Sequence, residues 1–249
     1  MKPIIQLNHA DLGYSKKPIL HDVSCTIQLG DQVGIVGQNG SGKTTFLRSI
    51  LGSLKPLKGT LQIDRTQRFA YVPQMDHLNV TLPLTVRETV LLAKRAKNIF
   101  GKISQDDEQS AEHSIKKVGL EHIQHLLIRE ISGGQRQRTL LAQALSQKPN
   151  VILLDEPTRG LDIVAEQDFL SLIQQLREEQ NMTLLLVTHA LQIPLNYTQK
   201  IFIMHRGSLI STTPNELIQT KKLEEIYGVP FIHNEQNGTK WVFPLKGVK

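Results

Sequence analysis

The segment QVGIVGQNGSGKTTFLRSILG, residues 32–52, is the most informative part of the sequence for predicting the fold. An apolar, strand-like run ends at Val36, the segment GQNGSGKT follows at 37–44, and a helical pattern continues to Gly52. This segment fits G-x-x-x-x-G-K-[ST], in which glycines let backbone N–H groups turn inward around phosphate oxygens. The strand before it and the helix after it are the context that such a loop requires. The sequence therefore predicts a nucleotide-binding α/β domain.

Two acidic residues supply the chemistry that this loop lacks. Lys43 is expected to reach the β- and γ-phosphate oxygens, and the Thr44 hydroxyl to bind Mg²⁺. In VILLDEP (151–157), Asp155 ends an apolar strand, where a second Mg²⁺ carboxylate belongs. Glu156 beside it can hold and deprotonate a water for attack on the γ-phosphoryl group. A solvated turn is the alternative, but the apolar run before the pair disfavours it.

Short strand-like runs alternate with helical patterns, which favours an α/β fold with a largely parallel sheet. The expected strands are 4–12, 23–29, 32–37, 68–74, 151–155, 182–189 and 200–212, the last folded as a hairpin about His205-Arg206-Gly207. No strand-like run follows 71–73 until 151, and Thr85…Glu88, Ser104…Asp107 and Gly119 are typical of helix ends. We predict one nucleotide-binding domain over 1–249. Its core is 1–74 and 150–212, its helical subdomain 75–149, and its tail 213–249, which opens on the cap Thr213-Pro214.

Composition excludes several classes of protein. The formal charge of +6 comes from 29 basic and 23 acidic residues, without a dense basic cluster, so no nucleic-acid partner is expected. The single cysteine excludes an intrachain disulfide framework and favours a reducing compartment. No apolar run approaches a membrane span, and the N-terminal residues turn polar too soon for a signal peptide. We therefore expect a cytosolic protein.

A second glycine turn lies in EISGGQRQRTLLAQAL, residues 130–145. Ser132 is a good N-cap, and Gln135 can complete a capping box. Gly133 and Gly134 are weak helix formers in the first turn. They leave backbone N–H groups uncovered at the positive end of a helix dipole, which suits an anion. The chain thus carries two predicted phosphate sites.

The motifs GQNGSGKT, ISGGQ, LLDEPT, GLD and VTH occur in this order, and together they resemble the nucleotide-binding subunit of an ABC transporter over residues 4–230. The resemblance implies a P-loop ATPase core with a mixed sheet, an N-terminal antiparallel β region and a helical subdomain. It also implies that two copies dimerise head to tail around ATP and Mg²⁺. The signature turn of one copy then covers the ATP on the phosphate loop of the other, which explains two sites in one chain.

The same resemblance implies roles for single residues. Tyr14 matches the aromatic that stacks on adenine, although a lone tyrosine is more often a packing residue. Asp162 matches the loop that couples the two sites. The implied catalytic residues are Glu156, Gln74 and His189, and the implied Mg²⁺ ligands are Thr44, Gln74 and Asp155; taken alone, His189 is more often a core or loop residue. The implied nucleotide contacts are Tyr14, Gly37, Gln38, Asn39, Gly40, Ser41, Gly42, Lys43, Thr44, Thr45, Ser132, Gly133, Gly134, Gln135 and Asp162. Ile131, Arg159 and Ala190 depart mildly from the family pattern.

Other ATPases fit less well. A P-loop kinase or GTPase would leave ISGGQ without a role, and a chromosome-organising ATPase would need a long coiled coil where only 75–131 lie. Translation-type relatives carry two cassettes per chain. We therefore predict a transporter subunit on the inner face of the membrane, with its permease on other chains and a substrate-binding protein. Segments 71–92 and 213–231 resemble importers of a metal ion (Mn, Zn or Fe) or an iron chelate. An exporter of lipid or small molecules is the alternative.

Overall fold

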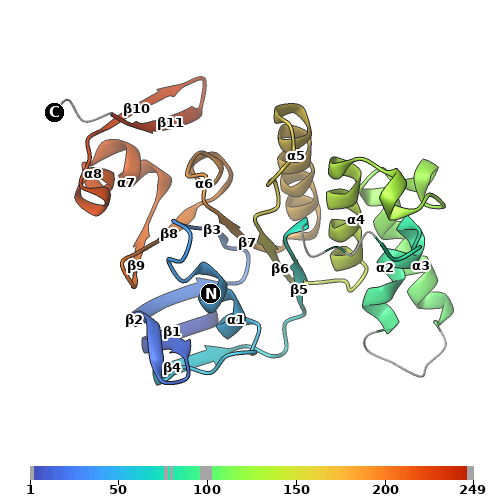
Figure 1. Cartoon of the computed structure of the whole chain (residues 1–249), viewed down its shortest axis with the longest axis horizontal. Helices are drawn as coiled ribbons and strands as arrows, with labels where there is room; N and C mark the ends of the chain where they lie inside the picture. The colour runs from blue at the N-terminus through green and yellow to red at the C-terminus, as the bar shows by residue number, and fades with distance from the viewer. Residues whose placement is uncertain (1–2, 76–77, 79–80, 96–102, 246–249) are drawn as a thin grey trace. The chain divides into compact units, whose positions relative to one another are not determined.

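The protein is described by a computed structural model that covers residues 3–75, 78, 81–95 and 103–245 (Figure 1). The chain forms two compact units. Unit 1 comprises Met1–Arg65 and Leu185–Lys249, and unit 2 comprises Thr66–Leu184. The predicted boundaries of the core, the helical subdomain and the tail stay a prediction.

An antiparallel sheet forms the first part of unit 1, with strand order β2-β1-β4. Its strands are β1 (Pro3–Tyr14), β2 (Lys17–Gln28) and β4 (Lys58–Ile63). The predicted N-terminal antiparallel region is therefore confirmed, but β2 starts before residue 23 and β4 was not predicted. The half-exposed β4 has no continuous apolar run that would predict a strand from its sequence. It forms a strand because its backbone pairs with β1. Burial of Cys25 on β2 raises its pKa to about 12 and keeps the thiol protonated.

A second sheet of unit 1 carries the phosphate loop. β3 (Gln32–Gly37) pairs in parallel with β8 (Lys200–His205), and β8 pairs antiparallel with β9 (Ser208–Thr212). On the other side of β3 lies β7 (Thr183–Thr188), whose residues from Leu185 onward belong to this unit. Every residue of β3 and β7 is buried, as a strand covered on both faces requires. Arg206 and Gly207 both have positive φ, which confirms the predicted hairpin turn.

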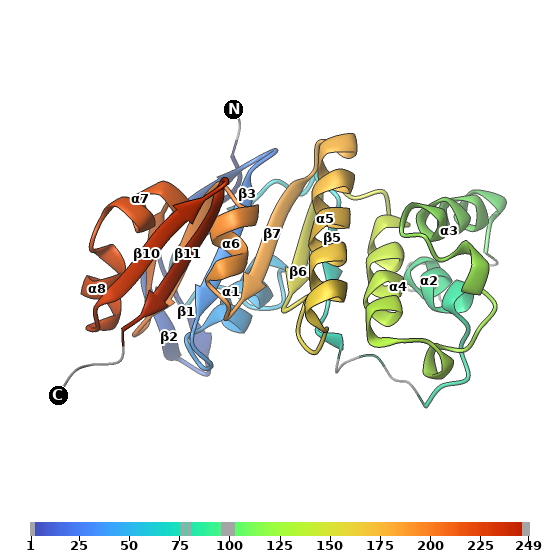
Figure 2. The ribbon, with the colours of Figure 1, turned by 90° about the horizontal axis from the view of Figure 1, so that it is seen from above.

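Helices and a further hairpin complete unit 1. The phosphate loop leads into α1 (Lys43–Ile50), which buries Phe46, Leu47 and Ile50. α6 (Gln192–Tyr197) follows β7, and α7 (Pro214–Gln219) and α8 (Lys222–Tyr227) follow β9. The helix α7 begins at the predicted Thr213 cap. The chain then forms the hairpin of β10 (Phe231–Gln236) and β11 (Thr239–Pro244), which was not predicted. Figure 2 shows this hairpin beside α6.

Unit 2 combines two parallel strands with helices. β5 (Phe69–Val72) pairs with β6 (Val151–Asp155). The helices are α2 (Val86–Arg95), α3 (Gln105–Lys117), α4 (Gly133–Leu145) and α5 (Ile163–Gln180), with short 3-10 turns at Glu121–Ile123 and Ile128–Glu130. The described residues between β5 and β6 contain only helices and one isolated bridge. None of the helices within the described ranges is long and apolar enough to cross a membrane.

Candidate functional site

The phosphate loop of unit 1 is closed around the ammonium group of Lys43. The Nζ atom donates hydrogen bonds to the carbonyl oxygens of Gly37, at 2.7 Å, and Gln38, at 3.2 Å. Gly40 and Gly42 have φ of +80° and +104°, a backbone region that glycine enters without steric cost. The side chain of Lys43 is therefore held inside its own loop.

Packing explains two of the three glycines of this loop, Gly37 and Gly42. A Cβ at Gly37 would lie 2.6 Å from the carbonyl oxygen of Met204 on β8, and a Cβ at Gly42 would lie 2.7 Å from Cγ of Leu20. The Ser41 hydroxyl is buried and has no hydrogen-bond partner among the described residues. Because buried polar atoms in proteins are nearly always paired, an oxygen of a bound phosphate is a suitable partner for this hydroxyl.

A cavity of about 570 Å³ in unit 1 brings the loop together with His189. Its lining includes Gly37, Gln38, Asn39 and His189, and it is completed by Leu191, Tyr227, Val229, Phe231 and Pro244. The volume lies within the range of small-molecule pockets. His189 follows β7, more than a hundred residues after the loop in sequence, so only the sheet order gathers these groups.

Three further predicted residues of unit 1 lie outside this lining. Tyr14 is 36% exposed, its hydroxyl accepts a hydrogen bond from Nη1 of Arg48 at 3.2 Å, and Cζ of Arg48 is 5.9 Å from the centre of its ring. The ring thus contacts Arg48 and remains partly accessible. In the first turn of α1, Thr44 is exposed and Thr45 is buried.

In unit 2 the buried carboxylate of Asp155 is fixed by a hydrogen-bond network. The Tyr71 hydroxyl donates to its Oδ2 at 3.0 Å, and Nε2 of Gln74 lies 3.4 Å from its Oδ1. Nη1 of Arg159 in turn donates to Oε1 of Gln74 at 3.3 Å. The sequence predicted roles for Asp155 and Gln74 but not for Tyr71. It identified Arg159 only as a departure from the family pattern.

Glu156 occupies an uncommon backbone conformation directly after β6. Its φ is +48°, and the residue is only 7% exposed. A non-glycine residue in the left-handed region carries strain, and such residues cluster at functional sites. The turn therefore places Glu156 directly after Asp155 at the end of the strand.

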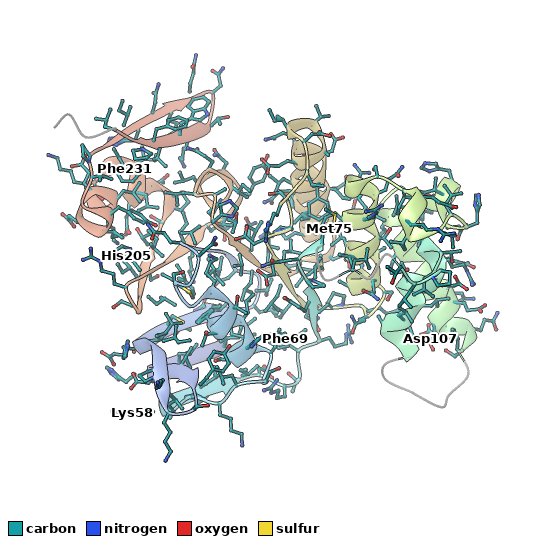
Figure 3. All side chains as sticks on the ribbon, viewed as in Figure 1. Lys58, Phe69, Met75, Asp107, His205 and Phe231 are labelled. Carbon is teal, nitrogen blue, oxygen red and sulfur yellow. The ribbon has the colours of Figure 1, made fainter. Side chains whose placement is uncertain are left out.

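The second glycine turn has the predicted capping box. The Ser132 hydroxyl accepts a hydrogen bond from the Gln135 backbone N–H at 3.2 Å, and Oε1 of Gln135 accepts one from the Ser132 N–H at 2.8 Å. Figure 3 labels Met75, whose Cε would lie 3.8 Å from a Cβ at Gly133. A Cβ at Gly134 would lie 3.5 Å from Cβ of Ala165. Both are ordinary contact distances, so packing within the chain does not require either glycine.

Asp162 acts locally as the N-cap of α5. Its Oδ1 accepts a hydrogen bond from the Ala165 N–H at 2.8 Å. The preceding Leu161 has its Cδ2 3.9 Å from the position of a Cβ at Gly133. The structure therefore brings three predicted segments of unit 2 together: the one after Gln74, the glycine turn, and the loop before α5.

Comparison with known proteins gives a consistent result. A family model described as "ABC transporter" matches residues 20–159. The chain is 31% identical over 229 residues to the zinc import ATP-binding protein ZnuC of Buchnera aphidicola subsp. Baizongia pistaciae, with 92% of each protein covered. A metal-chelate type ABC transporter, solved in an inward-facing conformation, matches with a TM-score of 0.87 at 25% identity over 98% of both chains. A dimeric ATP-binding cassette with bound ADP and Pi matches with a TM-score of 0.71 at 27% identity, over 84% of this chain and 98% of that chain.

The cap at Asp162 makes a testable prediction about its structural role, the stabilisation of α5. Asp162→Ala removes the acceptor for the Ala165 N–H and should lower the free energy of unfolding by about 1 kcal/mol. Asp162→Asn keeps the capping oxygen and should cost only a few tenths of a kcal/mol. Urea unfolding of the two variants measures the difference. Equal stability of Asp162→Ala and the unmodified chain would contradict the capping role.

Proposed function

Because the chain belongs to the ABC transporter family as an ATP-binding, ATP-hydrolysing subunit, we propose that it drives the import of a metal ion or metal chelate through a permease on other chains. The observation that carries the ATPase part is the loop closed around Lys43, together with the buried Ser41 hydroxyl, which has no partner within the described part of the chain. The cargo part is supported by similarity to a zinc import subunit and to a metal-chelate type transporter. Neither of these two relatives favours the exporter alternative.

We propose the following division of labour in hydrolysis. The ammonium of Lys43 leaves its carbonyl partners and stabilises charge on the β- and γ-phosphates. Glu156 accepts the proton of the attacking water, and His189 contacts that water and the γ-phosphate. When Mg²⁺ is bound, Thr44, Asp155 and Gln74 would hold it, and it would neutralise phosphate charge. Their hydroxyl, carboxylate and amide oxygens are the hard ligands that Mg²⁺ prefers, and Gln74, whose Oε1 accepts from Arg159 here, would have to turn that oxygen toward the ion.

A second copy of the chain is the proposed partner of the glycine turn. Gly133 and Gly134 are not required by packing within the chain, so their lack of side chains leaves the N-terminus of α4 open to an anion. In a head-to-tail dimer that anion is the γ-phosphate held by the other copy. Ser132 and Gln135 belong to the same turn, and Asp162 couples the two sites. A related cassette has been solved as a dimer with ADP and Pi.

The remaining roles follow from the same proposal. Tyr14 stacks on adenine, while residues 37–45 surround the phosphates. The chain works on the cytoplasmic face of the membrane, with a permease and a substrate-binding protein and without nucleic acid. The segment after Gln74 faces the permease; residues 76–77 and 79–80 of it lie outside the described residues. Nη1 of Arg159 donates to the side-chain oxygen of Gln74. In this proposal, the contact makes the segment after Gln74 sensitive to the state of the nucleotide.

The roles of Glu156 and Lys43 predict two different defects. Glu156→Gln should keep ATP binding and lower kcat by about 100-fold or more, because an amide cannot accept the proton. Lys43→Ala should instead weaken ATP binding, because the charge opposite the phosphates is lost. Steady-state ATPase assays and titration with a fluorescent ATP analogue separate the two. Unchanged kcat in Glu156→Gln would exclude it as the base, and unchanged affinity in Lys43→Ala would exclude the loop as the phosphate site.

The dimer predicts complementation between two inactive chains. Lys43→Ala and Ser132→Arg homodimers each carry a lesion in every composite site, whereas the mixed dimer carries both lesions in one site and leaves the other intact. Mixing equal amounts of the two variants should therefore restore about a quarter of the unmodified ATPase activity if the sites are independent, because about half of the dimers are mixed and each has one intact site. Two samples of one variant, mixed in the same way, are the control. Absence of recovery would contradict a shared site.

The cargo is tested by transport itself. Proteoliposomes that contain this subunit, its permease and its binding protein should accumulate manganese, zinc or chelated iron only when ATP is supplied. Liposomes with Glu156→Gln are the matched control. Their rate of metal accumulation should be about 100-fold lower, in line with the lost hydrolysis. Transport of a lipid, sugar or peptide without any response to metals would overturn the cargo proposal and leave the ATPase assignment standing.

A further inference from the structure

In the C-terminal hairpin of unit 1, the main-chain groups on the outer edge of β11 bond to side chains of α6. β11 pairs with β10 on one side, and in an antiparallel pair alternate residues turn their N–H and C=O groups away from the partner strand. Lys240 and Val242 are two such outward positions. The Lys240 N–H donates to Oδ1 of Asn196 at 2.8 Å, and Nδ2 of Asn196 donates to the Lys240 carbonyl oxygen at 3.0 Å. Nε2 of Gln192 donates to the Val242 carbonyl oxygen at 2.6 Å.

The geometry of helix and strand makes this contact specific. Gln192 and Asn196 are one helical turn apart, a rise of about 6 Å along α6. Two successive outward positions on a strand are about 6.7 Å apart. Two amide side chains on one face of a helix therefore match the spacing of the β11 edge and pair with it as a further strand would. Asn196 copies both bonds of a strand residue, since it accepts from and donates to Lys240.

α6 also connects directly to the segment that carries His189. The Ile193 N–H donates to the Ala190 carbonyl oxygen at 3.3 Å, and the Leu195 N–H donates to that of Leu191 at 3.2 Å. α6 also packs on β3. Pro194 lies so close to Gly34 that a Cβ at Gly34 would not fit. The helix after His189 is therefore held between the strand that leads to the phosphate loop and the C-terminal hairpin.

The cavity beside the phosphate loop also brings the C-terminal segment close to His189. Tyr227, Phe231 and Pro244 of the C-terminal segment line it together with His189 and Asn39. The rings of Tyr227 and Phe231 lie with their centres 5.9 Å apart, and the His205 ring meets Tyr227 edge-on at 5.4 Å. Figure 3 labels both His205 and Phe231 in this part of unit 1. These aromatic contacts link the hairpin, through Tyr227 of α8, to the end of strand β8.

We infer that the C-terminal hairpin positions the segment that carries His189 for hydrolysis, and that Asn196 is the positioning residue through which it acts. This inference rests on the proposed role of His189 at the γ-phosphate. Loss of the Asn196 contact frees α6 on one side and lets Ala190 and Leu191 shift with it. Small displacements of a catalytic group reduce turnover strongly, whereas the phosphate loop, which binds the nucleotide, keeps its own hydrogen bonds.

The experiment compares Asn196→Ala with Asn234→Ala, a matched control on the exposed face of β10, where the Asn234 side chain bonds only its neighbour Glu235 among the described contacts. For Asn196→Ala, hydrogen exchange of the Lys240 amide should become faster. Its ATPase kcat should fall by about tenfold, with KM for ATP within about twofold of the unmodified value. Asn234→Ala should change neither quantity. Asn196→Asp, which keeps the acceptor for the Lys240 N–H, should lie between them and serves if the alanine variant does not fold.

Two results overturn the inference. The first is faster exchange at Lys240 with unchanged kcat, which would make the contact merely structural. The second is unchanged exchange at Lys240 in Asn196→Ala, which would mean that the contact does not hold the hairpin. A failure of the proposed function is distinguishable, because the unmodified chain would then hydrolyse no ATP whatever the exchange of Lys240. In that case the role of Asn196 toward His189 fails with it.

Discussion

The hydrogen bonds from the Lys43 ammonium to the carbonyl oxygens of Gly37 and Gln38 are the interaction on which the rest of unit 1 depends. They require a loop that folds back on itself at the end of β3, and such a loop requires glycine where the backbone turns left-handed or meets β8. β3 is in turn fully buried between β7 and β8. The sheet thus provides a rigid base, and the loop at its end holds a cation ready for an anionic ligand.

Glycine has a different cause at each of the two turns. At Gly37 and Gly42 a side chain would collide with Met204 or Leu20, so packing alone selects glycine. At Gly133 and Gly134 a Cβ would meet only ordinary contacts. Since glycine also weakens the first turn of α4, the second pair needs an explanation from outside the chain. The proposed phosphate of a second copy would supply one, and this contrast supports the proposed shared site more directly than the motif itself does.

In unit 2, rigidity comes from side chains rather than from a loop. Asp155 is buried and would be poorly oriented without the Tyr71 hydroxyl and the Gln74 amide beside it. Arg159 extends this network by binding Gln74, so a residue that departs from the family pattern has a definite contact here. The strained backbone at Glu156 belongs to the same turn. The carboxylate proposed to bind Mg²⁺ and the one proposed to accept a proton thus follow each other at the end of one strand.

Features that depend on residues close together in the chain could be predicted from the sequence alone. These are the phosphate loop, the capping boxes at Ser132, Ser104 and Thr213, and the hairpin turn at Arg206-Gly207. The turn of the C-terminal hairpin, Asn237-Gly238, was equally readable, because this dipeptide favours the positive φ that both residues adopt. Only the tertiary structure decided the bonds from Tyr71 to Asp155, from Arg159 to Gln74 and from Asn196 to Lys240, whose partners are 84, 85 and 44 residues apart. The physical reason is range: caps and turns bond a residue to its near neighbours, whereas these pairs meet only after strands and helices have packed.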